Sequence, residues 1–140
     1  MRAIEESPET FFDRFRALAV EAHLYPAPWG FPLLLAKATP SQRGPSEALF
    51  LYALDRGPPP APTGRVQALF HGLVQEVFPY QRDLLHREGS RYRAAGRIRA
   101  LEEGFYVVEV GLPLLVHSET PLPEKAELLL FPPLMLFREP

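Results

Sequence analysis

The sequence predicts an α+β fold in which an antiparallel sheet of about six strands is covered on one face by two or three helices. Two stretches, around residues 8–22 and 66–78, have apolar residues at helical spacing. The strand-like stretches are clustered rather than alternating singly with helices, which favours antiparallel pairing. Because 140 residues is a common size for one domain, residues 1–140 are expected to form a single two-layer domain.

The N-terminal part is predicted to begin with a helix and to continue into strands. Ser7 is a suitable N-cap and Pro8 suits the first helical position, and the apolar spacing then continues for about four turns. Residues 25–32 are expected to form a loop, because three prolines remove backbone donors there. Residues 33–38 and 47–54 are expected to be strands.

The fold class depends on residues 66–78, which could form a helix or a strand. Their apolar residues follow the helical spacing without a miss, whereas a period of two would bury Gly72 and Glu76. We therefore predict a helix, followed by a shorter helical segment over residues 80–88. If residues 66–78 were instead a strand, the chain would form a small β-barrel with an N-terminal helix.

The C-terminal half is predicted to be a β region. Residues 91–101 and 105–116 are expected to pair as a hairpin, because Gly104 ends a three-residue loop and suits its left-handed position. The last strands are predicted at residues 126–131 and 134–137, where two prolines between them confine both strands to an edge or a corner of the sheet.

The most specific candidate site is a row of arginines on the first strand of that hairpin. Arg91, Arg93, Arg97 and Arg99 occupy odd positions, so all four project from one face, and Phe105 shares it. Such a row could track a phosphate backbone, with Phe105 as a stacking surface. A solvated face is the simpler interpretation, because Glu109 lies opposite Arg97 in the hairpin and the isoelectric point is only about 6.1.

Trp29, the only tryptophan, lies on the proline-rich loop and is a second candidate for binding. An aromatic ring on a stiff loop can anchor a partner, although packing over one end of the core is the more common role. The chain has no cysteine, its four histidines lack metal-ligand spacing, and the standard catalytic motifs are missing. We therefore expect no catalytic residue, no metal site and no cofactor.

These features favour a non-catalytic binding or assembly module that acts through protein–protein contacts. The alternatives are a nucleic-acid-binding domain that uses the face from Arg91 to Arg99, and a carrier of a small apolar ligand between sheet and helices. The apolar segment from Leu128 to Phe137 exceeds what an exposed edge strand tolerates, so either a helix covers it or it pairs with another copy of the chain. We favour the second, which predicts a homodimer through that edge.

Composition adds an expected location. The sequence begins without a signal peptide and lacks an apolar stretch long enough for a membrane anchor, so a cytoplasmic protein with no membrane partner is expected. Thirteen arginines against two lysines, together with 17 prolines, are typical of thermophilic proteins.

Overall fold

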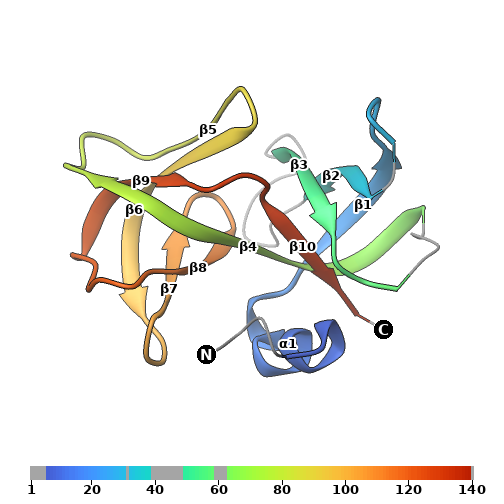
Figure 1. Cartoon of the computed structure of the whole chain (residues 1–140), viewed down its shortest axis with the longest axis horizontal. Helices are drawn as coiled ribbons and strands as arrows, with labels where there is room; N and C mark the ends of the chain where they lie inside the picture. Colours follow the sequence, from blue (N-terminus) through green and yellow to red (C-terminus); the bar gives the residue numbers. More distant parts are fainter. Residues whose placement is uncertain (1–5, 31, 39–48, 59–62, 140) are drawn as a thin grey trace. The chain divides into compact units, whose positions relative to one another are not determined.

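The computed structural model describes residues 6–30, 32–38, 49–58 and 63–139, and in these residues the chain is mostly β (Figure 1). The helical elements are α1 (Pro8–Arg14) and a single 3-10 turn, η2 (Arg16–Leu18). The strands are β1 (Val20–Pro26), β2 (Leu33–Ala38), β3 (Leu49–Asp55), β4 (Gly64–Phe78), β5 (Leu84–Glu88), β6 (Arg91–Ala100), β7 (Phe105–Glu109), β8 (Pro113–His117), β9 (Lys125–Leu130) and β10 (Met135–Arg138). The predicted α+β sheet covered by two or three helices is therefore wrong.

The chain divides into two compact units, which are described separately below. Unit 1 comprises Met1–Phe70 and Met135–Pro140, and unit 2 comprises His71–Leu134. Strand β4 belongs to both, because the boundary between the units falls between Phe70 and His71.

The five strands of unit 1 close into a ring. β1 pairs antiparallel with both β2 and β4, and β2 pairs antiparallel with β3. β3 then pairs in parallel with β10, and β10 lies beside β4, where the backbone N–H of Glu139 donates to the carbonyl of Gln67 at 3.0 Å. Every strand of this ring thus has a partner on both sides.

Small side chains occupy many of the inward positions of the unit 1 ring. Its inward positions include five alanines that are almost fully buried, which are Ala22, Ala36, Ala38, Ala53 and Ala68. Small residues suit the narrow interior of a five-stranded ring. Helix α1 packs against β10, where the ring centroids of Phe11 and Phe137 lie 4.5 Å apart.

Helix α1 begins where the sequence predicts and ends earlier. The Ser7 hydroxyl accepts a hydrogen bond from the backbone N–H of Thr10 at 3.2 Å, so the predicted N-cap is confirmed. The helix stops at Arg14 because the residues from Val20 onward pair as β1, and their apolar positions face the ring interior instead of one side of a helix.

Unit 2 contains a second ring with the same pattern of pairing. β4 pairs in parallel with β8 and antiparallel with β9. β7 pairs with β8 and with β6, and β6 pairs with β9, all antiparallel, which closes the ring. β5 adds to β6 outside the ring, so the predicted helical segment over residues 80–88 is wrong. Gly89, at a φ of 64°, lies between β5 and β6, which accounts for the glycine that favoured a helix end.

The predicted helix over residues 66–78 is wrong, because these residues belong to strand β4. Two features obscure the alternation of buried and exposed residues that a strand normally shows. Five consecutive residues, 68–72, are buried, so the middle of the strand shows no alternation. The register then shifts between Val74 and Glu76, which resets the alternation. Gly72 is buried because the side chains of Leu130 and Leu134 take the space that its own side chain would occupy.

Several predictions for the C-terminal half are confirmed. Arg97 pairs with Glu109 and Ile98 with Val108, in the predicted register of the β6–β7 hairpin. Gly104 has a φ of 81°, as the three-residue turn requires. Residues 105–116, however, form two strands, β7 and β8, because the chain turns back at Gly111, whose φ is 92°.

The apolar segment from Leu128 to Phe137 does not form an open sheet edge. Its two strands, β9 and β10, each pair with neighbours on both sides, and most of their apolar residues lie in the core. Phe131, between the strands, is 47% exposed. The apolar residues of this segment, which favoured a homodimer, are thus buried within the chain. The homodimer itself stays a prediction.

Among the residues that the structure describes, no helix is long and apolar enough to cross a membrane.

Candidate functional site

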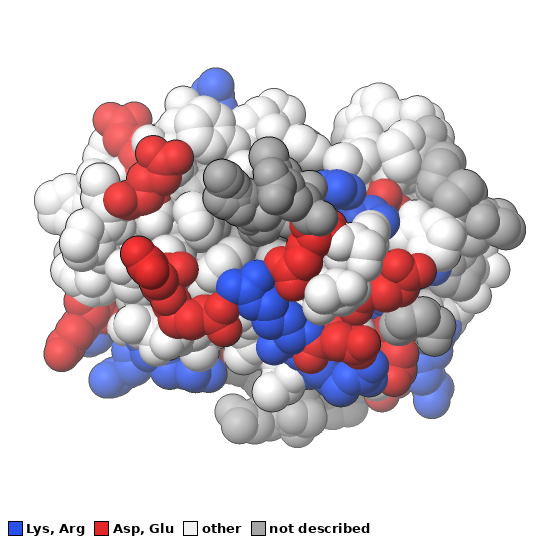
Figure 2. All heavy atoms as spheres, turned by 60° about the horizontal axis from the view of Figure 1, so that its bottom comes forward, with Lys and Arg blue, Asp and Glu red and all other residues white. Residues whose placement is uncertain are grey.

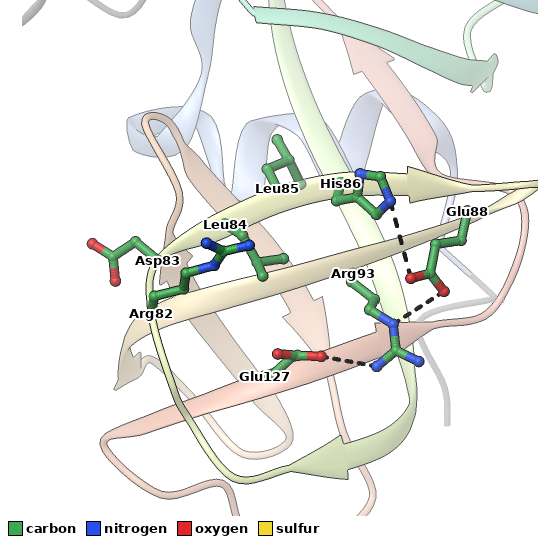
Figure 3. A pocket seen from close by; sticks show the side chains of 8 residues that line it. All are labelled: Arg82, Asp83, Leu84, Leu85, His86, Glu88, Arg93 and Glu127. Atoms are coloured by element: carbon green, nitrogen blue, oxygen red, sulfur yellow. Dashed lines mark hydrogen bonds and ion pairs between the residues drawn. The ribbon is translucent and has the colours of Figure 1, made fainter.

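Arg93 of the predicted arginine row is engaged with two carboxylates. Its Nε lies 3.1 Å from Glu88 Oε1 and its Nη1 lies 2.9 Å from Glu127 Oε2, as Figure 3 shows. The guanidinium also lies over the ring of Phe78, 4.9 Å from its centroid. The hydrogen bond to Glu88 is the main reason why the pKa of Arg93 is raised. This arginine is therefore neutralised within the fold.

The other three arginines of the row are exposed on β6. Arg99 lies 3.9 Å from Glu109, whereas Arg91 and Arg97 make no ion pair with another described residue. The row therefore alternates between free and neutralised charge. On the face that Figure 2 shows, acidic and basic side chains of the described residues are also interspersed. Neither observation favours a continuous track for a polyanion.

An open pocket of about 810 Å³ lies beside Arg93 in unit 2. Figure 3 shows its lining residues, which are Arg82, Asp83, Leu84, Leu85, His86, Glu88, Arg93 and Glu127. The lining thus holds three carboxylates and two guanidinium groups, a mixture that does not favour anion binding. Among the described residues, no group of three or more histidine, aspartate or glutamate side chains is placed to hold a metal ion.

Next to this pocket, the Tyr80 hydroxyl donates a hydrogen bond to Asp83 Oδ1 at 2.7 Å. This bond raises the pKa of Tyr80, because it stabilises the protonated phenol, while the positive charge of Arg97 acts in the opposite direction. Lys125 covers the ring of Tyr80, with its Nζ 5.0 Å from the centroid. These contacts link the loop before β5 to Lys125 of β9.

Phe105, the predicted stacking residue of the arginine face, is only 4% exposed. Its ring packs edge-on against His117 at 4.9 Å and lies 6.0 Å from the ring of His71. His71 is itself buried, with its Nδ1 2.9 Å from the carbonyl oxygen of Leu115. Phe105 is therefore buried and offers no surface on which a base could stack.

Unit 1 presents a different surface, which we call the aromatic face. It is the outward side of β1, β2 and β3, whose inward side is the alanine-rich core. The pairing places Tyr25 beside Leu35 and Leu35 beside Tyr52, and it places Lys37 beside Phe50. Because paired residues of neighbouring strands project from the same side, these side chains share one surface.

Three of the four aromatic rings of this face are well exposed, whereas Tyr52 is half-buried. Phe50 is 61% exposed, Trp29 59% and Tyr25 39%. Trp29 reaches the face from the loop between β1 and β2, where its ring meets Tyr52 edge-on at 4.9 Å. Large apolar side chains that form an exposed patch on one surface commonly mark an interaction site.

Basic and polar groups line one border of the aromatic face. The Nζ of Lys37 lies 6.0 Å from the centroid of Phe50, and His23 stacks on Tyr25 at 4.8 Å. Arg65 of β4 pairs with His23 in the sheet register, and its Nε lies 3.0 Å from Glu21 Oε2. The face thus combines aromatic rings with two permanent cations.

The sequence identifies Trp29 as a candidate but not the surface to which it belongs. Phe50 and Tyr52 occur at alternating positions of a strand whose other positions are also apolar, so no polar alternation marks the outward side. The spacing of two between Phe50 and Tyr52 was the only sequence feature that could have indicated this surface. Tyr25 and Lys37 join them only through strand pairing, which no local pattern shows.

Comparison with known proteins identified no relative of this chain. No protein-family model matches the chain, and neither a curated protein nor a solved structure matches it.

Proposed function

We propose that the protein is a non-catalytic binding protein whose aromatic face binds single-stranded nucleic acid. The observation that carries the proposal is the gathering of Tyr25, Trp29, Phe50 and Tyr52 on one outward sheet surface, beside Lys37 and Arg65. Aromatic rings on a sheet serve as stacking platforms, because every base has a π-face, and each stacked base contributes about 1–3 kcal/mol. Neighbouring cations add attraction to the phosphates.

The strand order of unit 1 supports the same proposal. Its first strand lies between the second and fourth, and its third is parallel to the fifth, which is β10. OB-folds, which are five-stranded Greek-key barrels, share this order and bind oligonucleotides or oligosaccharides on strands 2 and 3. Strands β2 and β3 hold the corresponding positions here and carry Lys37, Phe50 and Tyr52. Because a fold does not define a function, the side chains carry the argument.

Unit 2 offers a useful internal comparison. Its ring has the same cyclic order when it is traced from β6, which makes β6, β7 and β8 the corresponding strands. There the outward side chains of Phe105, Val107 and Leu115 are buried. Of the two equivalent surfaces, the one on unit 1 is open to a ligand.

The proposal is tested with a dye-labelled oligothymidylate of about fifteen nucleotides, a length that covers the usual site size of a single OB-fold. Fluorescence anisotropy near 50 mM salt should give saturable binding, and Phe50→Ala or Trp29→Ala should weaken it about 5- to 150-fold. Phe131→Ala removes a similarly exposed ring from unit 2 and should leave the affinity unchanged. Absence of saturable binding to single-stranded DNA and RNA would exclude this function.

Protein–protein contact is the second candidate, because exposed tryptophan and phenylalanine are common hot spots of protein interfaces. Trp29 and Phe50 would then bury themselves against a partner, which includes a second copy of the chain. Sedimentation of the unmodified protein at tens of micromolar should in that case show a dimer that Phe50→Ala dissociates. A monomer that binds the oligonucleotide favours the first proposal.

A further inference from the structure

We infer that a bound single strand crosses unit 1 perpendicular to β4, β1 and β2, with its phosphates on a row formed by Arg65, His23 and Lys37. This inference rests on the proposed function and specifies how the aromatic face would be used. It divides the face into a cationic row that contacts the backbone of the nucleic acid and an aromatic row that contacts its bases. Phe50 pairs with Lys37 at the β3 end of the cationic row and, being uncharged, would also contact a base.

The cationic row follows from the register of three neighbouring strands. Arg65 of β4 pairs with His23 of β1, and His23 pairs with Lys37 of β2. Neighbouring strands lie about 4.8 Å apart, so Arg65 and Lys37 begin about 10 Å from each other with His23 between them. Donors at this spacing suit consecutive phosphates of one strand, and His23 contributes a ring N–H even when it is uncharged.

The aromatic row lies two residues further along β1. Tyr25 pairs with Leu35 of β2, and Leu35 pairs with Tyr52 of β3, against which Trp29 packs. Two residues of a strand advance the chain by about 7 Å, so this row runs parallel to the cationic row and beside it. Bases that extend sideways from phosphates on the first row would therefore meet rings on the second.

The opposite side of the cationic row has a different character. Glu21 precedes His23 by two residues on β1 and pairs with Gln67 of β4, so an acidic and a neutral polar side chain border the row there. A carboxylate repels phosphate, and neither side chain offers a stacking surface. The bases should consequently lie over Tyr25 and Tyr52 rather than over Glu21.

The ion pair between Arg65 and Glu21 does not remove Arg65 from the row. Its Nε lies 3.0 Å from Glu21 Oε2, and the two side chains are 76% and 50% exposed. Exposed pairs of this kind are weak, so a phosphate can compete for the guanidinium. Two permanent cations should release about 1.4 counterions per single strand bound.

The test measures affinity for oligothymidylate as a function of salt. The unmodified protein should show a slope of log affinity against log salt of about −1.4, and Lys37→Met or Arg65→Gln should each flatten it by about 0.7. Trp29→Ala and Phe50→Ala should lower affinity at every salt concentration and leave the slope unchanged. An abasic deoxyribose-phosphate oligomer should bind the unmodified protein weakly with the same slope, and it should not distinguish the unmodified protein from Trp29→Ala or Phe50→Ala. Arg91→Gln, an exposed arginine of unit 2, is the control and should alter neither quantity.

The possible failures are distinguishable. If Trp29→Ala weakens binding while Lys37→Met and Arg65→Gln leave the salt slope unchanged, the phosphate row is wrong and the proposed function stands. If the unmodified protein binds no oligonucleotide at low salt, both the proposed function and the proposed phosphate-binding row are wrong. Both charge substitutions lie at exposed or half-buried surface positions, so circular dichroism should show unchanged folding.

Discussion

Arg138 of β10 donates two parallel hydrogen bonds to Asp55 at the end of β3, from Nε to Oδ1 and from Nη2 to Oδ2, both at 2.9 Å. The two side chains are 8% and 0% exposed. Gly57 completes the arrangement, because its backbone N–H donates to Asp55 Oδ1 at 3.1 Å and the Arg138 guanidinium fills the space of a Cβ. The pair joins the parallel strands that close the ring of unit 1.

Removal of one partner from this pair should strongly destabilise the protein. Arg138→Met leaves the Asp55 carboxylate buried without its counter-charge, and such changes cost about 3–5 kcal/mol of unfolding free energy. Urea unfolding followed by circular dichroism measures the loss. The double variant Asp55→Leu/Arg138→Met should recover much of it, because neither charge is then buried. A loss below about 1 kcal/mol in the single variant would show that the pair is not closed in solution.

The strand assignment of β4 makes a prediction that distinguishes it from a helix. Leu69 and Phe70 are 0% and 1% exposed, whereas Leu73 is 41% exposed, although a helix would bury all three on one side. Leu69→Ala and Phe70→Ala should therefore cost about 2–5 kcal/mol of stability, and Leu73→Ala less than about 1 kcal/mol. Equal costs at Leu69 and Leu73 would favour the helix.

Gly96 should not tolerate a side chain. A Cβ built on it would overlap the backbone carbonyl oxygen of Glu109 on the neighbouring strand β7. Gly96→Ala should therefore separate β6 from β7 and cost about 1–3 kcal/mol, as overpacking commonly does. Gly89→Asn is the matched control, because its φ of 64° suits asparagine and no heavy atom lies near. Thermal unfolding of both variants gives the comparison, and an unaffected Gly96→Ala would contradict the described packing.

The bond between Tyr80 and Asp83 predicts a dependence on pH. It raises the pKa of Tyr80 above the ordinary value of about 10, so its contribution to stability is present below that pH and is lost as pH rises through the folded value. Asp83→Asn should lower the pKa of Tyr80, and Arg97→Gln should raise it, since Arg97 favours the phenolate. Difference absorbance of tyrosinate, with Tyr80→Phe as the blank, measures both. Shifts in the same direction in the two variants would contradict the account.

The sequence was sufficient for several features that depend on neighbours along the chain. The cap of Ser7 on α1, the bounds of β2 and the register that pairs Arg97 with Glu109 all follow from local spacing and turn chemistry. It failed at β4, because a strand buried on both sides loses its alternation, and because a register shift after Val74 mimics the helical period.

The candidate sites likewise combine features that neighbouring residues in the sequence predict with contacts between residues that are distant in the sequence. The outward direction of the arginine row was predictable, but the neutralisation of Arg93 was not, since Glu127 lies 34 residues away in the sequence. The aromatic face likewise assembles Tyr25 and Phe50 through pairing with β2. Only Trp29 had a sequence feature, its proline-rich loop, that pointed to a surface role.

Trp29 provides the most direct test of the central claim, because it is the only tryptophan and lies exposed on the aromatic face. A base that stacks on the indole ring quenches its emission, so titration with unlabelled oligothymidylate reports contact at this residue alone. The account predicts saturable quenching that weakens in Phe50→Ala and persists in Phe131→Ala. Unchanged Trp29 emission throughout a titration in which anisotropy shows the oligonucleotide to be bound would place binding elsewhere and contradict the account.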